Sequence, residues 1–268
     1  ATAFNQPLNN WNVSHVTNMN RMFESAISFN QPLNDWDVSG VTDMGAMFYS
    51  HNTSAFNQPL GNWFINGDAT DFLEGSGMST DTYTKSLIGW ADRVQGDAAV
   101  STIIGPASVP TPYCASAKPA RDILTGTYNW TITDGGSVSC QTATYSADEN
   151  GTLTGDTFQY IADGQRGTPV MAVPATGYRF VSWSDGVATN PRTDGNLAGA
   201  LTVTAQFAAT DGNSEATKIG LRSERLIEAI KTMPVVGSLA KFITSVRDFL
   251  TYLTNNEDQL ETLTATER

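Results

Sequence analysis

A five-residue string, FNQPL, recurs three times near the start of the chain and constrains the fold more than any other feature. It occupies Phe4–Leu8, Phe29–Leu33 and Phe56–Leu60, a period of about 25 residues with two extra residues before the third copy. Such spacing is typical of stacked repeats, in which each copy can bury its apolar face only against its neighbours. The sequence therefore predicts an array rather than an isolated globule over this stretch.

Within each copy two apolar periodicities follow one another. Trp11 and Val13 alternate with polar residues, whereas Met19, Met22 and Phe23 have helical spacing, so the repeat predicts a strand and then a short helix. The third copy is matched by aligning its ATDF, residues 69–72, with the VTDM of residues 41–44. Stacking then predicts a continuous core formed by Phe4, Leu8, Trp11, Phe29, Leu33, Trp36, Phe56, Leu60 and Trp63.

The asparagine of each string is expected to have a structural role. Asn5, Asn30 and Asn57 should superimpose in the stack, with their amides bonded to the backbone at each corner. The polar strand positions Asn12, Ser14, Asp37 and Ser39 should instead form an outward face. That face is the predicted binding surface.

The pattern FNQPLxxWxVSxVTxMxxMF resembles the BspA-like leucine-rich-repeat surface proteins of bacteria. The resemblance covers residues 1 to about 75 and implies an α/β solenoid on a cell surface, often linked to adhesion, with no catalytic residues to transfer. The chain opens on ATAF, which aligns with AISF at residues 26–29, so we expect that further repeats and a secretion segment precede it in a longer protein.

After the repeats the sequence predicts a cap. The stretch from Ser79 to Val94 is helical in pattern, with Ser79 or Thr80 as its N-cap, and the segment from 113 to 136 resembles those that close arrays in the same surface family. The two cysteines, Cys114 and Cys140, flank that segment. A disulfide is favoured over a metal site, because the two histidines, His15 and His51, lie far away in the repeats.

From residue 142 to 209 the pattern changes to short β-rich runs separated by turns such as Asp163-Gly164 and Asp185-Gly186. The segments TPVMAVPATGYRFVSWSDG and LTVTAQF resemble the internalin-type B-repeat, which implies a small β-grasp-like module with Tyr178, Phe180 and Trp183 in its core. Calcium at the Asp-Gly turns remains an alternative to plain turns.

The tail, residues 210–268, reads as helical, with apolar residues at a 3-4 spacing. An apolar stripe this wide needs a partner. Three alternatives stay open: packing within the same chain, homo-oligomerisation, and binding to a membrane surface. The residues of the possible assembly helix are Val235, Leu239, Phe242, Val246, Phe249 and Leu253.

Charge and motif content narrow the function. Twenty-seven acidic residues against 15 basic ones give a net charge of −12, which disfavours nucleic acid as a partner, and no apolar segment is long enough to span a membrane. We find no paired-carboxylate, nucleophile or phosphate-loop motif, and expect no catalytic residue, cofactor or metal.

The sequence thus predicts a multi-module α/β and β protein: a leucine-rich-repeat-like solenoid at residues 1–75, a disulfide-bonded cap at 76–141, a B-repeat-like module at 142–209 and a helical tail at 210–268. The predicted function is that of a non-enzymatic, extracellular protein of the bacterial cell surface, which binds a protein or glycan in adhesion. A self-assembling structural subunit is the alternative, and a polysaccharide hydrolase is the least favoured.

Overall fold

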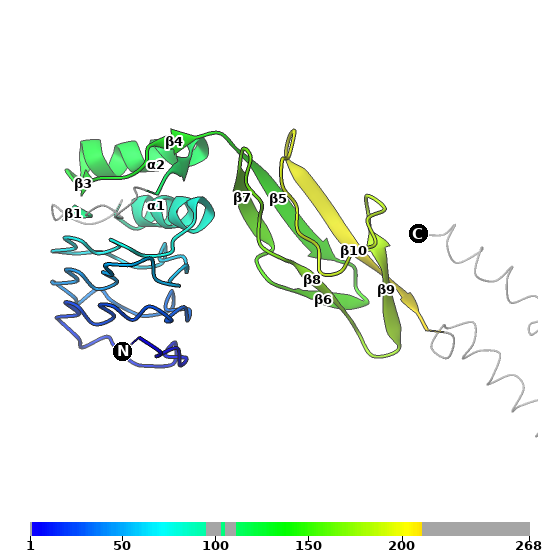
Figure 1. Ribbon diagram of the computed structural model, residues 1–268, viewed down its shortest axis with the longest axis horizontal. Helices are drawn as coiled ribbons and strands as arrows, with labels where there is room; N and C mark the ends of the chain where they lie inside the picture. Colours follow the sequence, from blue (N-terminus) through cyan, green and yellow to red (C-terminus); the bar gives the residue numbers. More distant parts are fainter. Residues whose placement is uncertain (1, 95–102, 105–110, 211–268) are drawn as a thin grey trace, which may run out of the picture. The chain divides into compact units, whose positions relative to one another are not determined.

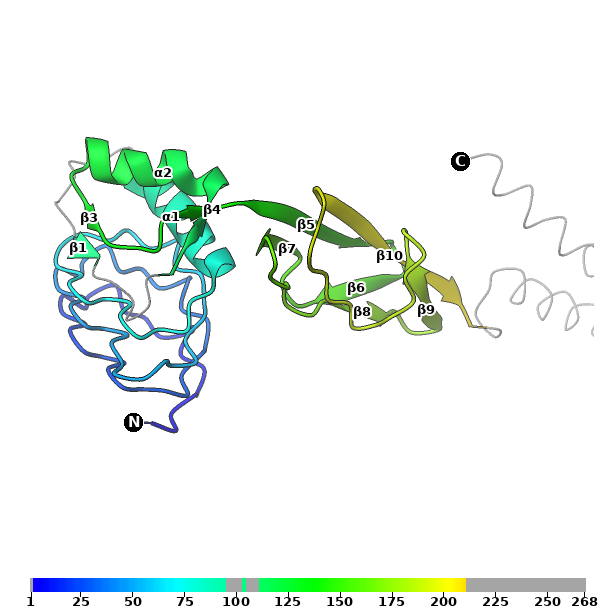
Figure 2. The same ribbon diagram turned by 45° about the horizontal axis from the view of Figure 1, so that its top comes forward.

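The structure, a computed structural model, describes residues 2–94, 103–104 and 111–210. Contacts divide the chain into two compact units. Of the described residues, those up to 144 together with 156–169 and 192–202 form the first unit, and 145–155, 170–191 and 203–210 form the second. The repeats and their cap lie in the first unit. Figures 1 and 2 show the repeats as turns of chain stacked one over another, with helices α1 and α2 above them.

The predicted strand-then-helix repeat is wrong. Residues 2–79 contain only turns and isolated parallel bridges, Asn18 to Asp43 and Asp43 to Asp68. The helical spacing has another cause: the N–H groups of residues 22, 24 and 26 donate back to carbonyl groups three residues earlier, while those of 19, 21, 23 and 25 donate to the next chain turn. Arg21 and Ser25 have φ of 58° and 55°, which prevents a helix from propagating.

The third copy stacks in a register different from the predicted one. The bridge from Asp43 to Asp68 makes Asp68 the equivalent of Asp43, so that ATDF lies three residues away from alignment with VTDM. The third copy has two residues fewer between Trp63 and Asp68 than the second copy has between Trp36 and Asp43. This shortening cancels the two extra residues that precede the third FNQPL string. Gly67 permits this shortening, because its φ is 133° and an added Cβ would lie 2.2 Å from the carbonyl oxygen of Thr42.

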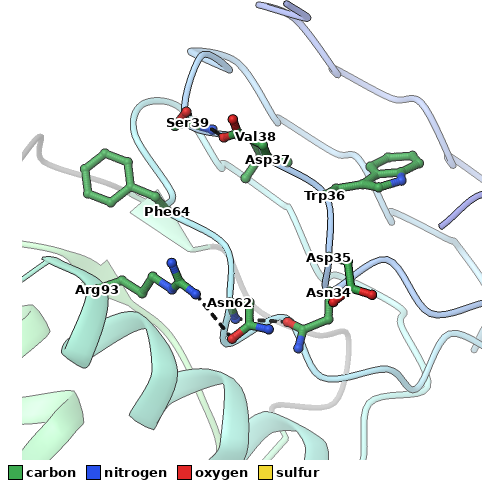
Figure 3. Close-up of a pocket in the computed structure, with 9 residues that line it drawn as sticks. All are labelled: Asn34, Asp35, Trp36, Asp37, Val38, Ser39, Asn62, Phe64 and Arg93. Carbon is green, nitrogen blue, oxygen red and sulfur yellow. Dashed lines mark hydrogen bonds between the residues drawn. The ribbon is translucent and has the colours of Figure 1, made fainter. Parts of the chain in front are cut away.

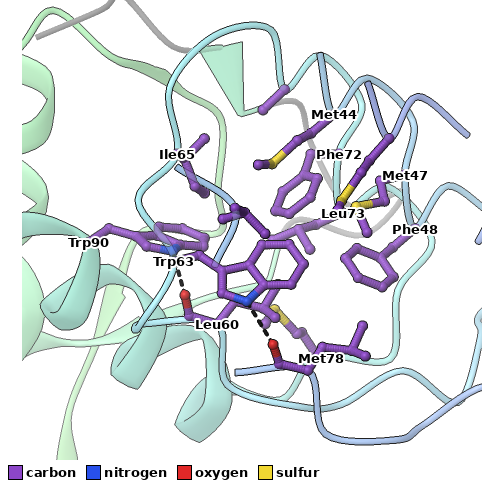
Figure 4. Packing of buried hydrophobic residues seen from close by; sticks show 14 of the residues in the cluster. Met44, Met47, Phe48, Leu60, Trp63, Ile65, Phe72, Leu73, Met78 and Trp90 are labelled. Carbon is purple, nitrogen blue, oxygen red and sulfur yellow. Dashed lines mark hydrogen bonds between the residues drawn. The ribbon is translucent and has the colours of Figure 1, made fainter. Parts of the chain in front are cut away.

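Aromatic side chains stack through the centre of the array. Phe29 and Phe56, Trp36 and Trp63 are all buried, and the two indoles are nearly parallel with centroids 6.3 Å apart. Each indole Nε1–H donates to the carbonyl oxygen of a leucine in the preceding turn, at 2.8 to 3.0 Å: Trp36 to Leu8, Trp63 to Leu33 and Trp90 to Leu60. Figure 4 shows the Trp63 and Trp90 bonds within the packed core.

Most of the predicted repeat core is buried, with two exceptions in the first turn. Leu8, Leu33 and Leu60 are no more than 5% exposed, whereas Phe4 is half-buried and Trp11 is 56% exposed. Trp11 lies in the first chain turn that the structure describes. Its indole therefore has no leucine carbonyl of a preceding described turn to bond.

A ladder of asparagine side chains ties the turns together at one corner, in agreement with the predicted structural role. Asn5 Oδ1 accepts from the backbone N–H and side-chain amide of the next turn, and Asn30 Oδ1 does the same one turn later. Asn57 Oδ1 accepts the Ser79 N–H and the Thr82 hydroxyl. The ladder therefore continues from the repeats into the cap.

Helix α1 (Thr80–Val94) replaces a chain turn at the end of the stack. Ser79 is its N-cap: the Ser79 hydroxyl accepts from Thr82 N–H and the Thr82 hydroxyl accepts from Ser79 N–H, a reciprocal cap. The hydroxyl of Ser86, on the buried face, accepts the Leu60 N–H at 3.0 Å. The helix packs closely because residue 89 is glycine, where a Cβ would lie 2.4 Å from the Gly61 oxygen.

The rest of the cap covers α1 and contains the predicted disulfide. Strand β2 (Tyr113–Cys114) leads into η1 (Ala115–Ala117), α2 (Lys118–Asp122) and η2 (Ile123–Thr127), and Cys114 is bonded to Cys140. Two short parallel pairs complete the cap: β1 (Ile103–Ile104) with β3 (Thr131–Ile132), and β2 with β4 (Ser137–Val138).

The remaining strands form a four-stranded sheet and a separate two-stranded antiparallel pair. The sheet has the order β7-β5-β10-β9, from β5 (Cys140–Ala147), β7 (Phe158–Ala162), β9 (Tyr178–Trp183) and β10 (Leu201–Ala209). Strand β6 (Gly151–Thr154) pairs with β8 (Met171–Pro174). Residues 140–210 hold strands and turns without a helix, so the β-rich content predicted for this module is observed.

In the second unit the predicted core aromatics differ in burial. Trp183 is fully buried, and its Nε1–H donates to the Thr189 carbonyl at 3.1 Å. Tyr145 and Phe180 both pack edge-on to Trp183, with centroids 5.9 Å away. Tyr178 and Phe180 are only half-buried.

The predicted assembly helix, from Val235 to Leu253, lies outside the described residues. Among the residues that the structure does describe, no helix has both the length and the apolar character needed to cross a membrane.

Replacing Asn30 with alanine should destabilise the chain. The Asn57 N–H loses its acceptor, whereas the Gln58 amide keeps its bond to the Asn30 backbone carbonyl, and an unmet partly buried donor costs about 1 to 3 kcal/mol. Urea unfolding followed by tryptophan fluorescence measures the change. Asn10→Ala, at an exposed position of the first turn, is the control and should stay within about 0.5 kcal/mol of the original chain. Equal midpoints for both variants would contradict the ladder.

Ala46→Gly should leave the stability unchanged or raise it by up to about 1 kcal/mol. Ala46 has φ of 53°, a left-handed conformation that costs an L-residue about 1 to 2 kcal/mol, more than the flexibility glycine adds to the unfolded chain. Ala55 is exposed and lies outside the left-handed region, so Ala55→Gly should destabilise by about 0.5 to 1 kcal/mol. Thermal unfolding compares the two; a larger loss at residue 46 would refute the assignment.

Candidate functional site

The predicted outward face is built by alternation in the segment that follows each repeat tryptophan. Val13 and Val38 point inward and are no more than 5% exposed. Their neighbours Asn12, Asp37 and Ser39 therefore lie at the surface. Because each turn stacks on the next, these polar positions form short rows across the repeats.

Each polar pair in the rows is fixed by its own turn. Asp37 Oδ1 accepts both the N–H of Ser39, at 3.1 Å, and its hydroxyl, at 2.6 Å. Asn12 holds Ser14 in the same way in the turn before. These local bonds, to the backbone N–H and to the hydroxyl, stabilise each turn, and they leave the second oxygen of the exposed Asp37 carboxylate without a described partner.

The third copy breaks the polar pattern. Where the first two copies have Asn12 and Asp37, it has Phe64, which is half-buried. An aromatic ring thus follows Asn12 and Asp37 in the row. Past it, Arg93 extends from the last turn of α1.

These groups enclose a surface hollow of about 390 Å³. Figure 3 shows the side chains around it: the second repeat supplies one wall, the third supplies another, and the helix supplies the guanidinium. The lining residues are Asn34, Asp35, Trp36, Asp37, Val38, Ser39, Asn62, Phe64 and Arg93.

A chain of hydrogen bonds fixes the base of the hollow. Asn34 Oδ1 accepts the backbone N–H of Asn62 at 2.9 Å, and Asn62 Oδ1 accepts an Nη2–H of Arg93 at 3.4 Å. Asp35 Oδ2 accepts from the Asn9 amide at 2.7 Å. Within the described part of the chain, Arg93 forms no ion pair, so its remaining N–H groups stay available for a ligand.

The electrostatics keep Asp37 ionised. The hydroxyl of Ser39 and then its backbone N–H, both donating to the carboxylate, lower the pKa of Asp37 below its ordinary value. An ionised carboxylate is an acceptor only, whereas the guanidinium and the two asparagine amides supply donors. The hollow therefore offers donors and acceptors side by side.

The two histidines do not contribute to this site. His15 Nδ1 bonds with the Ser14 hydroxyl, and His51 Nδ1 bonds with the Tyr49 hydroxyl, each within its own turn. No group of three or more potential metal ligands gathers anywhere in the described ranges.

The sequence pattern led to Asp37 and Ser39 but missed the rest of the hollow. Phe64 could have been found, because it places an aromatic residue where the other copies are polar. Asn62 and Arg93 could not, since they meet only when α1 stacks on the third repeat.

Two family models match the chain. Residues 1–80 match the family described as a Mycoplasma protein of unknown function, DUF285, and residues 141–211 match the divergent InlB B-repeat domain. Neither a curated protein nor a solved structure gives a significant match. The B-repeat resemblance is confirmed at nearly the predicted bounds, whereas the first match bears a description different from the BspA-like family. Together the two matches indicate a bacterial surface protein.

Replacing Ser39 with alanine should raise the pKa of Asp37 toward its ordinary value, because it removes the hydroxyl that donates most strongly to the carboxylate. An NMR titration of the carboxyl carbons measures this change. Because the folded-state pKa is lowered, ionised Asp37 stabilises the fold above the unfolded-state pKa, and this contribution is lost as the pH falls through the folded pKa.

Ser14→Ala is the matched control for that titration. It removes the equivalent hydroxyl beside Asn12 one turn earlier and should leave Asp37 unchanged. Equal titration curves for Asp37 in the original chain and Ser39→Ala would show that the bond does not hold the carboxylate.

Proposed function

We propose that this chain is a non-enzymatic, extracellular protein of the bacterial cell surface, whose stacked repeats present a binding face for adhesion to proteins or glycans. The observation that carries the proposal is the polar hollow, which is open to solvent and lined from two repeats and the cap. The surface-protein character of both family matches supports the location. The finer assignment to a BspA-like leucine-rich-repeat solenoid belongs to the same proposal.

The chemistry of the hollow favours binding over catalysis. A general acid at neutral pH needs a carboxyl group whose pKa is raised, as burial or a neighbouring carboxylate would do. The pKa of Asp37 moves the other way. Its carboxylate is also engaged with Ser39, which holds it as a fixed acceptor rather than as a proton donor.

The architecture suits a binding surface for a second reason. The lining residues lie on a stack held by the core indoles and the asparagine ladder, so a ligand would meet groups already in position. Preorganisation of this kind reduces the entropy that binding costs. A rigid, exposed, polar surface is what an adhesive repeat requires.

The test uses the full chain of residues 1–268 on arrays of extracellular matrix proteins and of glycans. We expect binding to at least one of these polymers, and a loss of at least about tenfold in the double variant Phe64→Ser, Arg93→Ala, which removes the aromatic ring and the guanidinium from the hollow. Lys118→Ala is the control for lost positive charge. Lys118 is exposed on α2, its pair with Asp122 contributes little, and binding should be retained.

Two results would contradict the proposal. One is an array that stays blank for both polymer classes. The other is release of soluble products from a polysaccharide by the original chain, which would show catalysis.

A further inference from the structure

We propose that the hollow binds an uncharged saccharide through pairs of its hydroxyl groups. This inference rests on the proposed binding function and names the ligand class of the same site. Its basis is the arrangement of free polar groups, the aromatic rim and the charge of the lining.

The side chains around the hollow offer both free hydrogen-bond acceptors and free donors. Asp35 and Asp37 each have one carboxylate oxygen used within the protein and one without a partner in the described ranges. The amide of Asn62 and the guanidinium of Arg93 face the same space with N–H groups to donate (Figure 3). A hydroxyl group donates and accepts at once, so neighbouring hydroxyls on a ring can satisfy a carboxylate and an amide together.

An aromatic ring on the rim supplies the apolar contact that sugars need. Phe64 projects beside the polar wall and is half-buried, so part of its surface is open. A pyranose has a face of C–H groups as well as a rim of hydroxyls. A mostly polar ligand with one apolar face matches a hollow that has polar walls and one exposed ring.

Charge selects against anionic ligands. Two carboxylates and one guanidinium line the hollow, and the chain as a whole carries a net charge of −12. Uronic acids and sulfated sugars would meet Asp35 and Asp37 at close range, with only Arg93 to offset them. An uncharged sugar avoids this repulsion and can still donate to the carboxylates and accept from Asn62 and Arg93.

A peptide ligand fits less well. Strand addition requires a row of free backbone N–H and C=O groups. At this wall the Ser39 N–H is already bonded to Asp37, and the Asn62 N–H is bonded to Asn34. These two backbone donors are not available to an added strand, which favours a ligand recognised through side chains.

The experiment titrates the isotope-labelled full chain with neutral disaccharides containing glucose, galactose or mannose, and with a uronic-acid disaccharide as the charged comparison. We expect shift changes at the amides of Asn62, Phe64 and Arg93 with at least one neutral sugar, and weaker binding of the uronate. Amides of α2, across the cap, should not move.

Variants then assign the contacts. Asp37→Ala should weaken binding by about tenfold or more, and Asp37→Asn, which keeps the shape and one acceptor, should weaken it less. Phe64→Ser should also weaken it, whereas Lys118→Ala should leave it unchanged. Far-ultraviolet circular dichroism and thermal unfolding show that each variant is folded, and the shifts in the original chain test the site without any substitution.

The outcomes separate this inference from the proposed function. Binding to a protein that Phe64→Ser, Arg93→Ala abolishes, with no response to any sugar, leaves the function standing and overturns the saccharide. Tighter binding of the uronate than of the neutral sugars also overturns it. No response to any protein or glycan overturns both.

Discussion

The first unit depends on hydrogen bonds that join each chain turn to the next. Backbone N–H groups at alternate residues, the asparagine carbonyl oxygens and the indole Nε1–H groups all cross from one turn to its neighbour. A chain turn without regular secondary structure would otherwise leave many buried polar groups unpaired, at a cost of several kcal/mol. These bonds allow a stack with neither helices nor extended strands to enclose an apolar core.

The sequence was sufficient to predict which residues of the repeat are buried, but not the conformation of its backbone. Recurrence of FNQPL identified the leucines, the later tryptophans and the asparagines that occupy equivalent places. It did not reveal left-handed residues such as Arg21 and Ala46, because neither is a residue type that favours positive φ. The apolar spacing of a helix and of consecutive tight turns is similar over one repeat, and periodicity alone does not distinguish them.

The candidate site shows the same division. Asp37 and Ser39 follow from alternation within one copy, which is local information. The hollow also needs Phe64 and Arg93, whose proximity depends on how the shortened third copy and α1 continue the stack. Gly67 made the shortening possible, yet a lone glycine in a sequence does not say which register results. Sites assembled from several turns are therefore harder to foresee than the turns themselves.

Helix α1 and its N-cap end the array by reproducing two contacts of one more repeat: the Trp90 indole donates to the preceding leucine carbonyl, and Ser79 and Thr82 donate to the asparagine oxygen. These bonds join α1 only to the last turn of the stack, so they do not depend on how many turns precede it. Duplication or deletion of a gene segment encoding one whole period would change the height of the stack without requiring new partners for α1. Copy number can then drift during evolution while the closing helix stays the same.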